Sequence, residues 1–125
     1  MSYPQNAYAK VASTGSSQRE LEAAALMKAA VRLKAVQDQW DTDHSDLDAA
    51  LAYNRKLWTI LATSATEAES PLPADLQRNI SLIAIFIFNR SLDLIVEPKR
   101  EDLDVLIEIN RNIAAGLQVI PKAAA

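Results

Sequence analysis

The sequence of 125 residues contains no cysteine, one histidine (His44) and two glycines, Gly15 and Gly116. The absence of cysteine excludes a disulfide framework, a thiolate metal site and a cysteine nucleophile. One histidine cannot form a multi-histidine metal site, and two glycines so far apart cannot form a glycine-rich phosphate-binding loop. We therefore expect no enzyme activity, and no catalytic, cofactor-binding or metal-binding residue.

Long apolar segments are also scarce. The N-terminal residues lack the apolar region of a secretory signal peptide. The longest apolar run, residues 80–88, includes Ser81 and is broken by Asn89 and Arg90. Because roughly 20 apolar residues are needed to span a bilayer, we expect no membrane insertion and a soluble, cytoplasmic protein.

The composition is that of a folded domain, since 50% of the residues are hydrophobic and 23% are charged. We expect a single helical domain over residues 1–125, ordered from about residue 8 to 117 and frayed at both ends. The prolines and glycines separate blocks of helical period, and Gly15 and Gly116 are expected near helix ends. The predicted helices cover residues 17–39, 45–65, 73–96 and 100–117.

The connections between these blocks are short. Short connections favour antiparallel neighbours, so we predict an all-α, antiparallel bundle of four main helices. A short N-terminal helix of one or two turns can form after Pro4. Ser17 has the spacing from Glu20 that is typical of a capping box at the start of the first main helix.

The second predicted helix contains AYNRKLWTI (residues 52–60), which mixes bases with aromatic residues as single-stranded nucleic-acid sites do. At ~100° per residue, Trp58 lies on the apolar face, Arg55 at its edge and Lys56 on the far side. A nucleic-acid site needs rings and cations side by side. This separation, together with a net charge of -3 and a pI near 5.1, disfavours RNA contact here and favours a core role for Trp58.

Two asparagines lie within apolar stripes. Asn54 sits in the apolar arc of the second helix, and Asn110 sits in that of the fourth. A buried amide without a partner costs roughly 1–3 kcal/mol. Two interpretations follow: the amides bond each other or a helix end and fix the register of packing, or one of them faces a groove and contacts a partner's backbone.

The third predicted helix has more apolar surface than one core needs. Only a narrow sector near Asn79, Asn89, Arg90 and Asp93 is polar. Such a helix is central, or it is covered by something outside the monomer or by the N-terminal segment. We favour a partner, with a groove between two helices as the natural seat for a third amphipathic one. The candidate contact residues are Phe86, Phe88, Leu82, Ile85 and Tyr53, with Asn54 and Asn110 added on the second interpretation above.

Five blocks of the sequence are distinctive: RELEAAALMKAAVRLKAVQ, LDAALAYNRKLWTIL, PLPADLQRNISLIAIFIF and LDVLIEINRNIAAGL, with AYAKVAS before them. Together they resemble the FlaF family of flagellar biosynthesis regulators. The resemblance extends from about Tyr8 to Leu117, and its most specific parts are YNRKLWTI and INRNIAAGL. It implies a small cytoplasmic helical protein of flagellated α-proteobacteria that promotes flagellin production, opposite a second regulator, FlbT. It brings no active-site residues.

The resemblance and the surplus apolar surface together suggest a chaperone that binds flagellin, whose terminal amphipathic helices stay unpaired until the filament assembles. The alternative is a post-transcriptional regulator that acts on flagellin mRNA, either directly or through FlbT. The basic residues Arg55 and Lys56 motivate direct RNA binding, and the overall acidity counts against it. A third option is binding to FlbT or to the flagellar export apparatus, with indirect control of flagellin.

Overall fold

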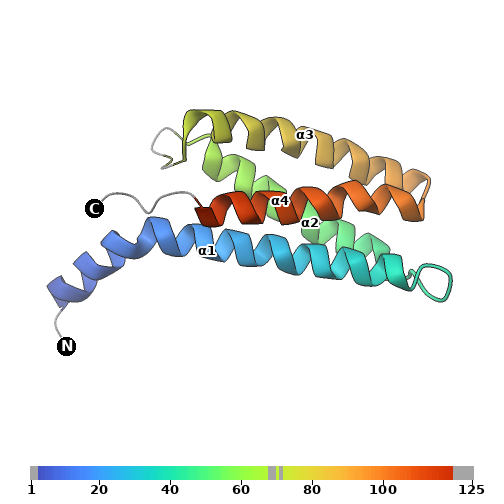
Figure 1. Ribbon diagram of the computed structural model, residues 1–125, viewed down its shortest axis with the longest axis horizontal. Coiled ribbons are helices and arrows are strands. Elements are labelled where there is room, and N and C mark those ends of the chain that lie inside the picture. Colours follow the sequence, from blue (N-terminus) through green and yellow to red (C-terminus); the bar gives the residue numbers. More distant parts are fainter. Residues whose placement is uncertain (1–2, 68–69, 71, 120–125) are drawn as a thin grey trace.

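The computed structural model describes residues 3–67, 70 and 72–119, with side chains from residue 18 onward. Four α-helices make up most of this part of the chain: α1 (Tyr3–Asp38), α2 (Leu47–Ala65), α3 (Ala74–Val96) and α4 (Leu103–Val119). A 3-10 turn, η1 (Arg100–Asp102), precedes α4. The described residues contain no strand, so the predicted all-α fold with four main helices is confirmed (Figure 1).

The prediction of the N-terminal region was wrong in one respect. α1 is one continuous helix from Tyr3 to Asp38, so no separate short helix precedes it and Ser17 does not begin it. Gly15 lies inside α1, and Gly116 lies inside α4, three residues before its last residue, Val119. Neither glycine takes a positive φ. A glycine terminates a helix by adopting the left-handed conformation, and these two stay helical instead.

The other helix ends match the sequence closely. α2 ends at Ala65 and α3 ends at Val96, just before the segment that contains Pro98. α3 begins at Ala74, with Pro73 as its N-cap residue. Fraying was expected before about residue 8 and after residue 117; of these positions, residues 3–7 belong to α1 and 118–119 to α4, and the others lie outside the described residues.

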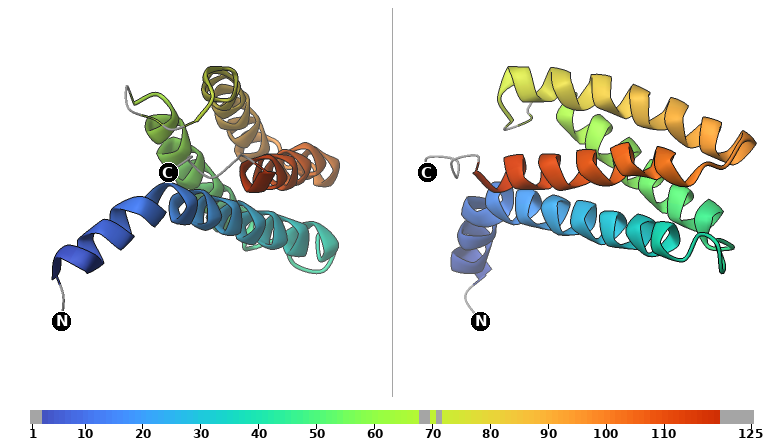
Figure 2. Two further views of the ribbon diagram at one scale, coloured as in Figure 1. Left: turned by 60° about the vertical axis from the view of Figure 1, so that its left-hand side comes forward. Right: turned by 45° about the vertical axis from the view of Figure 1, so that its right-hand side comes forward.

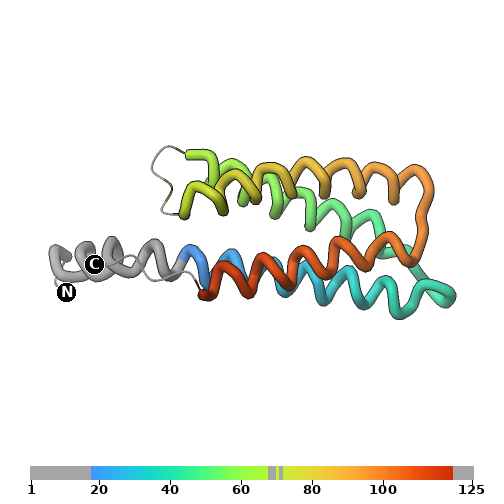
Figure 3. Tube along the Cα trace, turned by 45° about the horizontal axis from the view of Figure 1, so that its top comes forward, coloured from blue at the N-terminus to red at the C-terminus, as the bar shows by residue number. Residues whose placement is uncertain are grey.

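The helices pack in two pairs. α1 packs most extensively against α4, α2 packs against α3, and a smaller α1–α2 contact joins the pairs. The chain reverses its direction along the long axis between consecutive helices (Figures 1 and 3). In the left view of Figure 2, which is turned by 60° from Figure 1, the four helices lie around one shared interior. That interior holds Trp58 and the fully buried leucines Leu26, Leu33, Leu51, Leu61, Leu94, Leu103, Leu106 and Leu117.

A polar joint ties the end of α1 to the start of α4. The buried Gln37 side chain donates through Nε2 to the Arg100 carbonyl at 3.1 Å and to Asp104 Oδ1 at 2.6 Å. Arg100 Nε returns a hydrogen bond to the Gln37 carbonyl at 3.1 Å. These bonds satisfy a carbonyl at the C-terminal end of α1 and hold α4 in register beside it.

The connection between α1 and α2 is held by side chains. Arg32 forms a bidentate pair with Asp46, with N–O distances of 3.0 and 2.9 Å. This hydrogen-bonded guanidinium lowers the pKa of Asp46 below its ordinary value. The Trp40 and His44 rings stack with centroids 4.5 Å apart, and His44 Nδ1 lies 2.9 Å from the Trp40 carbonyl. The histidine is thus part of an exposed loop contact.

Candidate partner-binding surface

One side of α3 is apolar and uncovered. Leu82, Ile85 and Leu92 are 60%, 58% and 54% exposed, Val96 is exposed still further, and Phe86 is 39% exposed. At ~100° per residue these five positions fall within an arc of ~120°. We call this surface the α3 apolar face. The opposite side of the helix carries Ile80, Ala84, Ile87, Ser91 and Leu94, all of which are buried.

α3 is also long and apolar enough to cross a bilayer, judged by length and composition alone over an 18-residue window within Ala74–Val96. Only 28% of that window is buried. Counting only consecutive apolar residues in the sequence therefore underestimated the apolar length of α3, because Asn89 and Arg90 interrupt the run only briefly. Such a helix within the described chain is weak evidence for a span, and it does establish an unusually apolar exterior.

Phe86 lies at one edge of the α3 apolar face. The guanidinium of Arg90 lies over the Phe86 ring, 5.3 Å from its centroid. Arg90 also pairs with Asp102 of η1 at 3.6 Å. This edge of the face is therefore fastened to the start of α4, whereas Leu82, Ile85 and Leu92 carry no such cover.

The other edge of the face borders a groove between α2 and α3. Phe88 and Leu92 of α3 and Arg55 and Thr59 of α2 line a hollow of about 340 Å³. A second hollow of about 310 Å³ lies farther along the same two helices, lined by Ala65, Thr66, Ala74, Gln77, Arg78 and Ser81. We call the two hollows together the α2–α3 groove.

Tyr53 lies elsewhere, on the side where α2 meets α1. Its half-buried ring has Lys28 Nζ at 5.9 Å and the Arg32 guanidinium at 6.0 Å from its centroid. The bases beside this aromatic residue therefore come from α1, which a wheel of α2 alone cannot reveal. Arg32 already pairs with Asp46, so Lys28 is the base with the fewer bonds here.

Asn54 and Asn110 lie in the interior and bond each other. Asn110 Nδ2 donates to Asn54 Oδ1 at 2.7 Å, and Trp58 Nε1 donates to Asn110 Oδ1 at 2.9 Å. All three side chains are 0% exposed. The first interpretation is the one that the structure supports: the two amides bond each other, and this bond joins α2 to α4. Neither amide reaches the surface, where a partner's backbone would have to meet it.

Comparison with known families gives one match. The model of the family "Flagellar protein FlaF" matches residues 4–117. The chain belongs to the FlaF family. This result confirms the resemblance seen in the sequence and makes the chain a flagellar protein by family. Comparison with curated proteins and with solved structures found no match.

In this FlaF-family chain the seven residues proposed from the sequence occupy four places. Leu82, Ile85 and Phe86 share the α3 apolar face, and Phe88 lines the α2–α3 groove beside it. Tyr53 lies near α1, and Asn54 and Asn110 lie in the core. Only the first two places form a continuous surface.

Of the residues that line the α2–α3 groove, only Phe88 was predicted as a partner contact; Arg55 and Thr59, on the α2 wall of the first hollow, were not. The sequence placed Arg55 at the edge of the apolar arc of α2, which agrees with its half-buried position, and it gave no signal for Thr59. Arg55, at the edge of the apolar arc of α2, lines a groove only because α3 packs beside α2. The sequence did not show which helix packs there.

Proposed function

We propose that this FlaF-family protein binds flagellin as a cytoplasmic export chaperone, and that it promotes flagellin production by doing so. The observation that carries the proposal is the α3 apolar face, where large apolar side chains stay exposed although the core is complete without them. A monomeric soluble domain rarely leaves such a patch uncovered. An amphipathic helix laid against it matches the terminal helices of flagellin that the family resemblance suggests as guests.

The size of the face is compatible with reversible binding. Fully burying a Leu, Ile or Phe side chain is worth about 1.5–3 kcal/mol, and the partly exposed ones here retain roughly half of that. Micromolar affinity corresponds to about 8 kcal/mol, after the cost of association has been met. The α3 apolar face alone therefore falls short of tight binding. Contacts in the adjoining groove would add to it.

The proposal is tested by titrating purified flagellin, and flagellin that lacks its terminal helices, into the full-length protein in a calorimeter. We expect micromolar or tighter binding that requires the terminal helices. Leu82→Ser and Ile85→Ser should each weaken binding about tenfold, since each removes one apolar contact worth roughly 1.4 kcal/mol. Leu21→Ser is the matched control, because Leu21 is 68% exposed and belongs to α1 rather than to α3.

Three results would reject the proposal. The first is no binding of flagellin at micromolar concentration. The second is an equal loss of affinity in the Leu21 control, which would point to a nonspecific apolar effect. The third is flotation of the protein with phospholipid vesicles that flagellin does not displace, which would make the α3 apolar face a membrane surface.

The alternative function, control of flagellin mRNA, has one observation in its favour. Lys28 and Arg32 both lie over the Tyr53 ring, and an aromatic ring beside cations is a minimal element of single-strand binding. Direct binding predicts that affinity for the message leader falls steeply with salt. A gel-shift titration with wild type and Tyr53→Leu decides this. An absent or salt-insensitive complex leaves only indirect control, through FlbT or the export apparatus, as the alternative.

A further inference from the structure

The α2–α3 groove has the length of a short helix. Its two hollows are lined on the α2 side by Arg55 and Thr59 in one case and by Ala65 and Thr66 in the other. Thr59 and Thr66 are seven residues apart, which is two helical turns or ~10 Å. A helix bound parallel to the groove would therefore place two of its own side chains, also seven residues apart, in the two hollows.

The hydroxyl groups along the groove donate their protons within their own helices. Thr59 Oγ1 donates to the Arg55 carbonyl at 2.8 Å, and Thr66 Oγ1 donates to the Ala62 carbonyl at 2.9 Å. Ser81 Oγ donates to the Gln77 carbonyl at 3.2 Å. Gln77 Nε2 is also occupied, since it donates to the Leu72 carbonyl at 2.9 Å. These residues therefore offer a ligand packing surface and acceptor oxygens, but their hydroxyl protons are already used.

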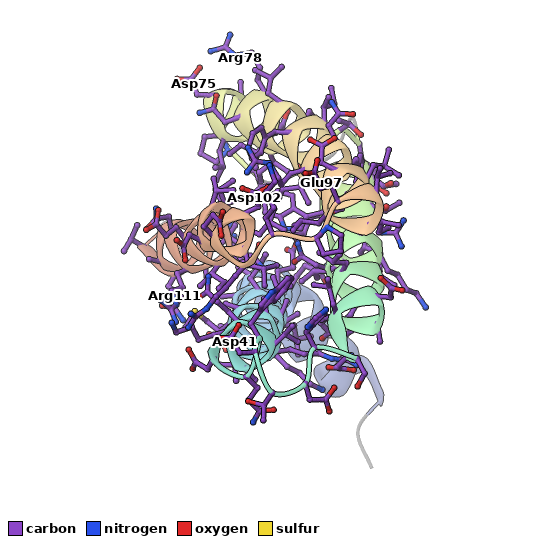
Figure 4. All side chains as sticks on the ribbon, turned by 90° about the vertical axis from the view of Figure 1, so that its right-hand side faces the viewer. Asp41, Asp75, Arg78, Glu97, Asp102 and Arg111 are labelled. Atoms are coloured by element: carbon purple, nitrogen blue, oxygen red, sulfur yellow. The ribbon has the colours of Figure 1, made fainter. Side chains whose placement is uncertain are left out.

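Arg55 is different. It is half-buried at the wall of the first hollow, and its Nε is buried without a hydrogen-bond partner among the described residues. The described lining residues of both hollows include two arginines and no carboxylate. The second arginine, Arg78, is largely exposed and bonds Asp75 at 3.4 Å, and Figure 4 shows both side chains projecting outward from the start of α3.

We infer that the α2–α3 groove takes an amphipathic helix of the partner that carries a carboxylate, and that Arg55 receives this carboxylate. The two apolar side chains spaced seven residues apart fill the hollows, and the acidic side chain lies near the Arg55 end. The inference rests on the proposed function for the identity of the partner, flagellin. It adds the groove as the place of binding and an acidic amphipathic helix as the class of ligand.

The physical reason is charge complementarity in a partly dry site. A guanidinium with an unsatisfied buried nitrogen gains more from a carboxylate than an exposed one does, because charge-assisted hydrogen bonds strengthen where water is excluded. The apolar residues Phe88 and Leu92 on the opposite wall supply that exclusion. An acidic helix is thereby preferred over a basic or neutral one of equal apolar content.

The experiment uses the full-length protein and two synthetic peptides, the N-terminal and C-terminal helical segments of flagellin, with binding followed by fluorescence anisotropy. Arg55→Met keeps the aliphatic stem and removes the charge, and it should weaken binding about tenfold to a hundredfold. Arg55→Lys keeps the charge and loses Nε, and it should recover only part of the affinity. Arg111→Met is the matched control, because Arg111 is exposed on α4, and no α4 residue is among the described lining of either hollow.

A double-mutant cycle identifies the carboxylate. Each acidic residue of the bound peptide is changed to Gln in turn, and one of these changes should cost wild type about tenfold and cost Arg55→Met almost nothing. Urea unfolding of Arg55→Met should show unchanged or higher stability, since the variant removes an unsatisfied donor. If Arg55→Met does not fold, the same cycle is run with Arg55→Lys, which must give a smaller coupling to the same acidic residue because lysine keeps the charge; no coupling to any acidic residue would overturn the inference.

The outcomes separate the inference from the proposed function. If the peptides bind and Arg55→Met binds as tightly as wild type while Leu82→Ser does not, the groove inference is wrong and flagellin binds through the α3 apolar face alone. If neither peptide nor flagellin binds, the proposed function fails and the inference falls with it. If sedimentation shows a dimer that Leu92→Asp dissociates, the groove is occupied by a second copy of the chain, and the inference is overturned.

Discussion

α4 and α3 use their apolar residues in opposite ways. On α4 the buried positions are Leu103, Leu106, Ile107, Asn110, Ala114 and Leu117, and Val119 is its one large apolar residue that is exposed in the described chain. On α3 six large apolar residues are exposed: Leu82, Ile85, Phe86, Leu92, Ile95 and Val96. The two helices thus differ less in apolar content than in where that content points.

The difference arises from spacing in the sequence. The buried residues of α4 recur at intervals of three and four, so they form one stripe that α1 covers. In α3 the residues from Leu82 to Phe88 are apolar at every position, so they point around the whole helix. One neighbouring helix can cover only one stripe. Angular distribution, rather than total hydrophobicity, therefore decides how much of a helix remains available to a partner.

The contrast between α3 and α4 is tested most directly by changing one leucine to alanine on each helix. Leu106→Ala should lower the free energy of unfolding by about 2–5 kcal/mol, because Leu106 is fully buried and its removal leaves a cavity. Leu82→Ala should change it by less than about 0.5 kcal/mol, because Leu82 is on the surface. Urea unfolding followed by circular dichroism measures both. Similar losses in the two variants would mean that the α3 apolar face is buried in solution.

The buried polar group of α4 provides the next test. Asn110→Leu removes the acceptor of Trp58 Nε1 and the donor to Asn54 Oδ1, and we expect a loss of about 2–3 kcal/mol. Asn54→Leu should cost less, because it also removes Asn54 Nδ2, which is buried without a partner. Unfolding curves give the ranking, and Trp58 fluorescence reports the broken bond. A larger loss for Asn54→Leu would contradict the network as described.

A gain in stability is expected at Gly116. A Cβ added there meets no atom within 4 Å, and the residue is helical without a positive φ. Gly116→Ala should therefore stabilise the protein by about 0.5–1 kcal/mol, through helix propensity and a less flexible unfolded chain. The thermal midpoint measures this. A decrease would show that Gly116 is required for an approach to α4 by something outside the described chain.

The smallest expected effect concerns Glu22 of α1. Burial raises its pKa above the ordinary value of 4.5, and the charge of Arg19 opposes that shift. Since the folded state holds the proton more tightly than the unfolded state, stability falls as the pH rises from the ordinary value through the folded pKa. Glu22→Gln should therefore gain stability relative to wild type at neutral pH and gain less at about pH 4. Glu20→Gln is the exposed control, and an equal pH dependence in both variants would refute the assignment.

Much of the fold follows from local pattern. Proline positions and the helical period are enough to predict the ends of α2 and α3 and the burial of Trp58, because these depend on residues close in sequence. The start of α1 was missed for a local reason too. Gly15 reads as a helix end in sequence, although a glycine is also tolerated inside a long helix at a cost of ~1 kcal/mol.

The rest depends on contacts between distant segments. Gln37 bonds Arg100 and Asp104 across 63 and 67 residues, and Lys28 and Arg32 reach Tyr53 from another helix. The candidate partner-binding surface also has one part that the sequence predicts and one part that it does not. The surplus apolar residues of α3 are visible in the sequence, whereas the α2–α3 groove exists only where two helices meet. No wheel of a single helix contains that information.

The packing of α1 against α4 also has a consequence for biosynthesis. Gln37 leaves the ribosome 63 residues before Arg100, its partner in the joint between the two helices. At ~5–20 residues per second this gap is ~3–13 seconds, during which the apolar stripe of α1 has no α4 to cover it. Translation must therefore reach the last helix before the core can close. A nascent chain interrupted within α4 would be a substrate for general chaperones and proteases rather than a partly active protein.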